Sequence, residues 1–246
     1  MNIIHTLGLY YQLMAKIVAK PEKPSVYLKL IVDDLEKIGI NSAGIVAIIS
    51  VFMGAVITLQ TAININSPLI PRYLIGFAAR ESILLEFSST MVSLILAGKV
   101  GSNIASEIGT MRVTEQIDAL EIMGVNSAGY LILPKIIAFV IFIPVLVILS
   151  ITIGVFGGWL AGLFTGVIST GDYLLGVQFD FHAYKLVYTL IKAEVFAFVI
   201  ASVSGFHGYY AKGGALDVGR ASTKAVVYSM VLILMFNLLL SYFLLL

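Results

Sequence analysis

The chain of 246 residues is 59% hydrophobic and only 12% charged, with a formal net charge of +1 and no cysteine. Soluble domains carry about 25% charged residues, so this composition predicts an integral membrane protein. The small net charge argues against a nucleic-acid-binding protein, and the lack of cysteine excludes disulfides and thiolate metal sites. We expect one membrane domain over residues 1–246.

Residues 3–18 predict an amphipathic helix that lies in the membrane interface. Its apolar face is formed by Ile3, Leu7, Tyr10, Tyr11, Met14 and Val18. The first basic residue, Lys16, follows the apolar stretch, which is unlike a secretory signal peptide. Pro21 and Pro24 should break this helix. A second amphipathic piece at 25–38 completes an interfacial region of residues 1–40.

Five apolar runs are long enough to cross a membrane, because a spanning helix needs about 20 mostly apolar residues. We place the spans near residues 43–63, 82–106, 136–171, 186–206 and 225–246. The connections are then 64–80 and 167–185 on one side, and 107–134 and 207–224 on the other. The predicted fold is an all-α integral membrane protein with five transmembrane helices within residues 41–246.

The orientation follows from the basic residues, which concentrate on the side of the cell membrane that faces the cytoplasm. Of the 15 Lys and Arg residues, eleven lie on the side of the N-terminus. These are Lys16, Lys20, Lys23, Lys29, Lys37, Lys99, Arg112, Lys135, Lys212, Arg220 and Lys224. We therefore expect a cytoplasmic N-terminus and, after five spans, a C-terminus on the opposite, periplasmic side.

The third span carries a row of glycines at a spacing of four residues. The row is Gly154, Gly158, Gly162 and Gly166. Small residues at this spacing let two helices approach closely. We interpret the row as a packing surface rather than as a ligand site.

A polar, glycine-rich segment at residues 97–125 predicts a cytoplasmic helix over 111–123, which Gly124 can end. Its apolar face is Val113, Ile117, Leu120 and Met123, and its acidic face is Glu115, Asp118 and Glu121. A helix resting on lipid headgroups is the alternative interpretation. Because the inner leaflet attracts Lys and Arg, the acidic face favours a protein partner with a basic groove.

A cytoplasmic amphipathic helix between two spans is typical of an ABC-transporter permease, which an ATPase moves through that helix. Residues 1–246 would then form a single permease domain. The chain itself lacks a phosphate-binding loop, because Gly98-Lys99 is followed by Val100 where Ser or Thr is required. We expect ATP to be hydrolysed by another polypeptide and this chain to be a transport subunit, not an enzyme.

Several motifs of the chain resemble the MlaE/YrbE permease family. The matching stretches are residues 97–102, 106–120, 123–125, 154–162, 205–209, 213–215, 218–223 and 226–227. Where the family usually reads Arg-Glu-Leu-Gly-Pro, this chain reads Leu-Glu-Phe-Ser-Ser at residues 85–89, so only Glu86 is kept.

The resemblance implies a five-span fold with an N-terminal interfacial helix, a homodimer and a coupling helix at residues 111–123. It also implies two copies of a cytoplasmic ABC ATPase, which use ATP and magnesium, while this chain holds no cofactor or metal. Phospholipid would move between the bacterial inner membrane and a periplasmic MCE-domain protein. This transport would maintain the lipid asymmetry of the outer membrane. The resemblance also allows a small STAS-like regulatory protein, and the lack of a transit peptide favours a bacterial over a plastid member. The residues expected to couple to the ATPase are Glu107, Arg112, Glu115, Asp118 and Glu121.

Three charges, Glu86, Lys192 and Glu194, fall within predicted spans, where an ion without a partner costs several kcal/mol. We predict a Glu86–Lys192 pair between spans two and four. The pair would either line the lipid path and contact a headgroup phosphate, or fix the helix register as a structural salt bridge. Other candidates for the lipid path are Met53, Val56, Leu59, Tyr73, Leu74 and Phe77, with ordinary packing as the alternative for each.

Two other function classes compete with the permease. An intramembrane enzyme would need a nucleophile with a base or paired carboxylates, and the sequence has neither G-x-S-x-G nor H-E-x-x-H. An ATP-independent channel or scaffold would not need a force-transmitting helix. Lipid movement or turnover without an ATPase would favour one of these two classes.

Overall fold

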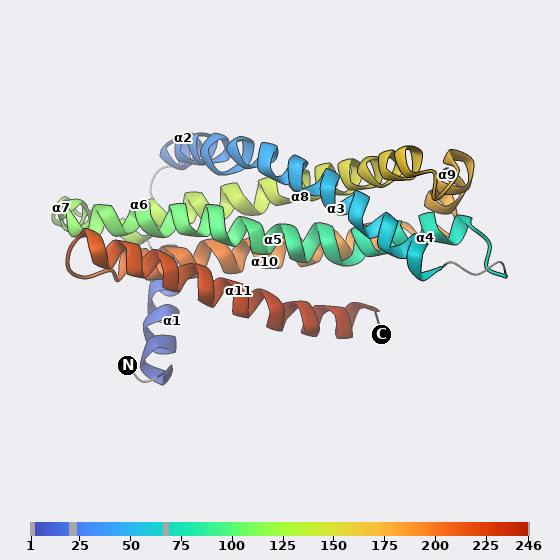
Figure 1. Ribbon diagram of the computed structural model, residues 1–246. Coiled ribbons are helices and arrows are strands. Elements are labelled where there is room, and N and C mark those ends of the chain that lie inside the picture. Colours follow the sequence, from blue (N-terminus) through green and yellow to red (C-terminus); the bar gives the residue numbers. More distant parts are fainter. Residues whose placement is uncertain (1–2, 20–23, 66–68, 246) are drawn as a thin grey trace. The chain divides into compact units, whose positions relative to one another are not determined.

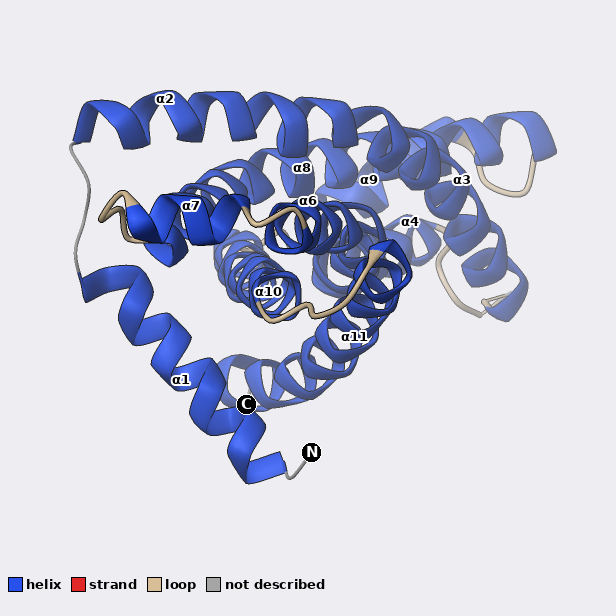
Figure 2. Ribbon diagram, turned by 90° about the vertical axis from the view of Figure 1, so that its left-hand side faces the viewer, coloured by secondary structure: helices blue, strands red, loops and turns tan. Residues whose placement is uncertain are grey.

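The structure is a computed structural model that describes residues 3–19, 24–65 and 69–245. All regular secondary structure in these residues is helical (Figure 2). Five helical runs are long and apolar enough to cross a membrane. They are Val26–Asn64, Tyr73–Val113, Ser127–Thr165, Ala183–Tyr209 and Ala215–Leu244. The predicted all-α, five-span membrane fold is confirmed.

The order of the helices along the chain can be followed by colour in Figure 1. The α-helices are α1 (Ile3–Ala19), α2 (Pro24–Asp34), α3 (Asn41–Asn64), α4 (Tyr73–Ser82), α5 (Val92–Leu96), α6 (Ser102–Val113), α7 (Gln116–Ile122), α8 (Ser127–Thr165), α9 (Thr170–Gln178), α10 (Ala183–Tyr209) and α11 (Ala215–Leu245). Three π-helical segments join some of them, namely η1 (Leu35–Ile40), η2 (Ile83–Met91) and η3 (Ala97–Gly101). Such segments often occur at functional sites, and η2 contains Glu86.

The predicted connections are too long, because helices continue into them. The loop expected at 64–80 ends where α4 begins at Tyr73, and the one expected at 207–224 ends where α11 begins at Ala215. Within 107–134, α6, α7 and the start of α8 are all helical. An average of hydropathy detects the apolar part of a helix. It misses a helix end that carries a buried charge in an ion pair, such as Lys135, which pairs with Asp34 and Glu107.

The predicted interfacial helix at 3–18 forms α1. Leu13 and Ile17 are buried against the protein, whereas Leu7, Tyr11 and Val18 of the predicted apolar face are exposed. As expected, the first helix does not continue through this proline-containing stretch: α1 ends at Ala19 and Pro24 begins α2, while Pro21 lies outside the described residues.

The chain divides into two compact units, described separately below. Unit 1 consists of Met1–Ser42, Leu94–Ile143 and Glu194–Leu246, and unit 2 consists of Ala43–Ser93 and Pro144–Ala193.

In unit 1, α6 and α11 lie side by side, seen as the green and red helices of Figure 1. Gly109 of α6 faces Val218 of α11, where a Cβ on the glycine would lie 3.1 Å from Val218 Cγ1. The hydroxyls of Ser102 and Ser222 are 2.9 Å apart in the same seam. Small residues thus allow α6 and α11 to pack closely, and α7 follows α6 in the chain.

In unit 2, glycines let α3 and α8 pack backbone against backbone. A Cβ on Gly54 would overlap the Gly154 carbonyl, and Gly158 faces the hydroxyls of Thr58 and Tyr173. The packing interpretation of the glycine row is confirmed for Gly154, Gly158 and Gly162. Gly166 differs, because it follows the last residue of α8 with a positive φ of 68° and faces open space.

Candidate coupling segment and intramembrane charge pair

The prediction of one continuous helix over residues 111–123 is wrong, because two helices share this segment. The α6 helix continues to Val113, Thr114 is its C-cap, and α7 begins only at Gln116. Between them Glu115 has a left-handed backbone with φ 61°. A non-glycine residue seldom adopts this conformation, which turns the chain out of the α6 axis.

The end of α7 matches the prediction. Gly124 has φ 80°, its N–H donates to Glu121 O at 3.0 Å, and Val125 N–H donates to Leu120 O at 3.0 Å. These two bonds define a Schellman motif, in which a left-handed residue ends a helix. The short helix α7 therefore has a residue with a left-handed backbone conformation at each end, Glu115 before it and Gly124 after it.

The predicted apolar face of this segment is only partly correct. Ile117 is fully buried, but Met123 is 69% exposed, and Ile122, which was not placed on that face, is 87% exposed. The helix break rotates α7 relative to the residues before it, so one periodic pattern over 111–123 does not describe both pieces. The surface of α7 is therefore apolar at Ile122 and Met123, with acidic residues beside them.

Two of the predicted coupling residues pair with each other across the helix break. Arg112 Nη1 donates to Asp118 Oδ1 at 2.7 Å, and the Arg112 guanidinium lies 5.8 Å from the centre of the Tyr209 ring. Both side chains remain partly exposed, and Glu115 is exposed. The pair fixes the angle between α6 and α7 and leaves Glu115 at the surface.

Glu121 anchors α7 to three other helices. Its Oε1 accepts hydrogen bonds of 2.8 Å from Lys16 Nζ of α1, Ser127 Oγ of α8 and Tyr209 OH of α10. These bonds, with that from Lys16 the largest influence, lower the pKa of Glu121 to about 2. Asn126 adds a bond from Nδ2 to Lys16 O at 2.7 Å. Figure 2 shows α1 and α7 on the same face of unit 1.

Glu107 has an intramolecular partner that sequence reasoning missed. Lys135 Nζ of α8 lies 2.8 Å from Glu107 Oε2 and 3.0 Å from Asp34 Oδ1, so one buried ammonium joins α2, α6 and α8. From the sequence, Lys135 is counted only among the cytoplasmic charges. The available signal was its position among apolar residues at the start of a span, where a cation needs a partner.

The predicted Glu86–Lys192 pair is confirmed, with Lys192 Nζ 3.1 Å from Glu86 Oε1. The Lys192 side chain is fully buried, whereas that of Glu86 is 50% exposed. Lys192 Nζ also donates to Leu85 O at 3.2 Å and to Tyr188 OH at 3.0 Å. The ammonium is thus surrounded by oxygen acceptors, and Glu86 is the charged partner that an incoming molecule could reach.

Glu194, the third predicted intramembrane charge, is exposed on α10. Unit 2 contains a further buried cation that the sequence did not single out. Arg80 Nη1 donates to Val177 O at 2.8 Å and Phe179 O at 2.9 Å, so Arg80 fixes α4 to the end of α9.

The other lipid-path candidates lie on α3 and α4 of unit 2. The rings of Tyr73 and Phe77 are 5.1 and 5.8 Å from the ring of Phe179, so these two side chains contribute to packing. Val56 is exposed, and Met53, Leu59 and Leu74 are partly buried. Their contact with lipid stays a prediction.

Comparison with known proteins identifies the family. The family described as Permease MlaE matches residues 31–243. A "Probable ABC transporter permease protein" of Rickettsia bellii is 40% identical over 223 residues, which cover 87% of this chain and 83% of that protein. The Haemophilus influenzae "Intermembrane phospholipid transport system permease protein MlaE" is 30% identical over 233 residues, covering 91% of this chain and 85% of that protein. A probable ABC transporter permease protein of Synechocystis is 33% identical over 213 residues, covering 85% and 80%. With five candidate spans and a match over most of its length, the chain belongs to the MlaE permease family.

Proposed function

We propose that this chain is the membrane subunit of an ABC transporter that moves phospholipid between the bacterial inner membrane and a periplasmic MCE-domain protein. The name of the Haemophilus influenzae relative supports phospholipid as the substrate. In this proposal two copies of the chain form a homodimer, and a lipid cavity lies near the two-fold axis. Two cytoplasmic ATPase subunits supply the energy from ATP and magnesium, and a small STAS-like protein regulates them. The net result is the maintenance of outer-membrane lipid asymmetry.

The observation that carries the proposal is the exposed helix α7, held to the rest of unit 1 through Glu121. An ATPase that grips α7 pulls on α1, α8 and α10 at once, because all three donate to the same carboxylate oxygen. The exposed side chains of Ile122 and Met123 supply an apolar contact. Glu115 and Asp118 favour a basic rim on the partner, in line with electrostatic complementarity at interfaces.

Placement in the membrane follows the basic residues. The N-terminus, α7 and the α10–α11 connection are assigned to the cytoplasm, and the C-terminus to the periplasm. The exposed apolar face of α1, with Leu7, Tyr11 and Val18, suits a helix lying in the cytoplasmic interface of the inner membrane.

Lys192 is the residue we assign to the lipid headgroup. A phosphate can compete with the half-exposed Glu86 carboxylate for the Lys192 ammonium, because the buried ammonium would keep its bonds to Leu85 O and Tyr188 OH. The alternative is a purely structural salt bridge. In that case the double exchange E86K/K192E should restore the lipid transport that either single change abolishes. Failure of the exchange to restore transport, in protein that folds and binds the ATPase, favours the headgroup role.

The first test is affinity purification of the chain from its native cells in mild detergent, followed by identification of the proteins that accompany it. We expect an ATPase in equal amount and an MCE-domain protein. A chain that purifies alone under conditions that preserve its oligomer would contradict the proposal and favour the channel, scaffold or enzyme alternatives.

The role of α7 is tested by E115K/D118K, which reverses two exposed or partly exposed charges. The matched control is D33K/E36K, which reverses two exposed charges on α2 and η1 of the same unit. We expect the α7 variant to lose the co-purifying ATPase and the control to keep it. Equal ATPase recovery from both variants would show that α7 is not the docking helix.

A further inference from the structure

We propose that Asp34, Glu107 and Lys135 form an ionic latch, and that its opening regulates how a force on α7 reaches the membrane spans. All three residues belong to unit 1. The latch is closed in this structure, because the ammonium of Lys135 on α8 holds the carboxylate of Glu107 on α6. In the open state Lys135 releases Glu107 and keeps Asp34 of α2. The regulatory role rests on the proposed function, whereas the opening itself is a property of this chain.

The latch joins one ammonium to two carboxylates that differ in burial. The side chains of Lys135 and Asp34 are 7% and 9% exposed, whereas that of Glu107 is 39% exposed. Water can therefore hydrate the Glu107 carboxylate once it leaves the ammonium. A buried cation that loses its only charged partner strongly destabilises the conformation that contains it. Because Asp34 lies 3.0 Å away, Lys135 can release Glu107 without becoming an unpaired buried charge.

Helix α7 is connected to both sides of the latch. Its side chains form hydrogen bonds with Arg112 of α6 and with Ser127, the first residue of α8. Lys135 lies eight residues, about 12 Å, beyond Ser127 along α8. A tilt of α7 therefore acts on α6 and α8 at separate points, and the ion pair between Glu107 and Lys135 resists a change in the relative position of these two helices.

The other carboxylate of the latch is held against α8 by a second contact. Asp34 is the last residue of α2, and η1 follows it directly. Gly39 of η1 lies against the ring of Phe142 on α8, where an added Cβ would overlap the ring. The segment that carries Asp34 is thus attached to α8 both at Lys135 and at Phe142. We therefore expect Asp34 to stay with Lys135 when α6 and α8 separate.

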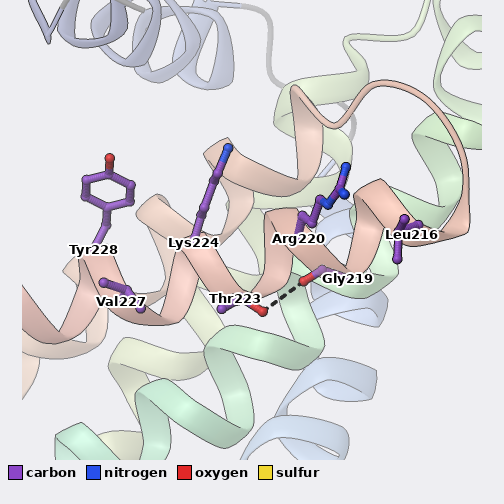
Figure 3. Close-up of a pocket in the computed structure, with 7 residues that line it drawn as sticks. All are labelled: Leu216, Gly219, Arg220, Thr223, Lys224, Val227 and Tyr228. Carbon is purple, nitrogen blue, oxygen red and sulfur yellow. Dashed lines mark hydrogen bonds between the residues drawn. The ribbon is translucent and has the colours of Figure 1, made fainter.

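An ion pair within one helix cannot act in this way, and α11 supplies an example. Arg220 Nη1 lies 3.2 Å from Asp217 Oδ1, three residues away on the same helix. Figure 3 shows Arg220 and Lys224 on an open surface whose lining residues all belong to α11. The pair of Arg220 with Asp217 joins no two helices, so its removal is a matched control for the removal of the Glu107 charge.

The opening is measured as a distance between α6 and α8 in the full-length chain. The chain has no cysteine, so N103C/I141C introduces two sites for spin labels. Asn103 is exposed one turn before Glu107, and Ile141 is 56% exposed on α8. The labelled chain is placed in nanodiscs of phosphatidylethanolamine and phosphatidylglycerol, and electron paramagnetic resonance gives the distance between the labels. We expect one main distance for the closed latch and a second distance when it opens.

Two substitutions should shift the ratio of the second distance to the first in opposite directions. E107Q removes a charge that only the closed state uses, so the ratio in the chain alone should rise about fivefold. D34N removes the charge that the open state needs. In the complex with the ATPase, ATP and magnesium should populate the second distance, and D34N should lower the ratio about tenfold. The controls D33N, at the exposed neighbouring position, and R220Q should leave both ratios unchanged.

A merely structural ion pair predicts another pattern, in which E107Q and D34N both lower the unfolding temperature and neither creates a second distance. The proposal is overturned if E107Q leaves the distance distribution unchanged or only broadens it. It is also overturned if both substitutions shift the ratio in the same direction. If D34N does not fold, E107Q decides alone by the first of these criteria.

The measurement on the chain alone needs no ATPase and no transport. A chain that recruits no ATPase, but opens with E107Q, would refute the proposed function and leave the latch in place. A chain that recruits its ATPase, but whose distances do not respond to E107Q, would refute the latch alone.

Discussion

Replacing Gly54 with alanine tests the backbone packing between α3 and α8. The added Cβ would overlap the Gly154 carbonyl, and the next nearest atoms are Gly154 C and Cα. None of these is a side-chain atom that could rotate away, so one helix must move. In the same seam Gly157 faces Val51 O, so the movement cannot be absorbed by a neighbouring gap.

The expected cost follows from overpacking, which destabilises a well-packed core by about 1–3 kcal/mol. For a chain of about 250 residues, each kcal/mol lowers the unfolding temperature by about 2–4 °C. We therefore expect G54A to lower the apparent unfolding temperature by about 2–12 °C.

The assay is thermal unfolding of the purified chain in detergent at a fixed scan rate, followed by the fluorescence of Trp159 on α8. The matched control is G44A on the same helix α3, where an added Cβ meets nothing within 4 Å. Alanine is the better helix former by about 1 kcal/mol, so G44A should be neutral or stabilising. An unfolding temperature for G54A equal to or above that of G44A would refute the close backbone contact.

Two further predictions concern the buried and anchoring charges of unit 1. K135M should destabilise the chain by about 3–5 kcal/mol, because it leaves the buried Asp34 carboxylate without its cation, whereas K29M at an exposed site should not; protease resistance at increasing temperature measures the difference. The pKa of Glu121 is lowered to about 2, so its stabilisation of α7 is complete above its ordinary pKa near 4.5 and is lost as pH falls toward 2. The chain has no cysteine, so a spin label on I122C should report rising mobility over that pH range, and E121Q should make α7 mobile at neutral pH; a label whose mobility ignores both changes would contradict the anchor.

Much of the fold is readable from the sequence because the membrane imposes simple rules. Long apolar runs located all five spans, and the spacing of Gly154, Gly158 and Gly162 indicated close packing. The pairing of Glu86 with Lys192 followed from the cost of an isolated ion in the bilayer and from their similar depth.

The shape of the candidate coupling segment, residues 111–123, was harder to predict, because it depends on contacts between residues far apart in the chain. Helical periodicity assumes a continuous axis, and Glu115, which breaks that axis, is not a residue type that marks a left-handed turn. The pattern of acidic residues also gave Glu121 an outward role, whereas its partner Lys16 lies 105 positions away. Periodicity indicates which face a side chain shares, but not which helix will meet it.

The left-handed residue between α6 and α7 has a mechanical consequence. With its axis broken at Glu115, α7 cannot act as a piston that drives α6 along its length. A force applied to α7 would instead rotate it about Glu115. The bonds from Lys16, Ser127 and Tyr209 to Glu121 would pass that force to α1, α8 and α10. Because α1 takes part of that force, a change in how α1 sits on its surroundings would in turn alter the angle that α7 offers to a partner.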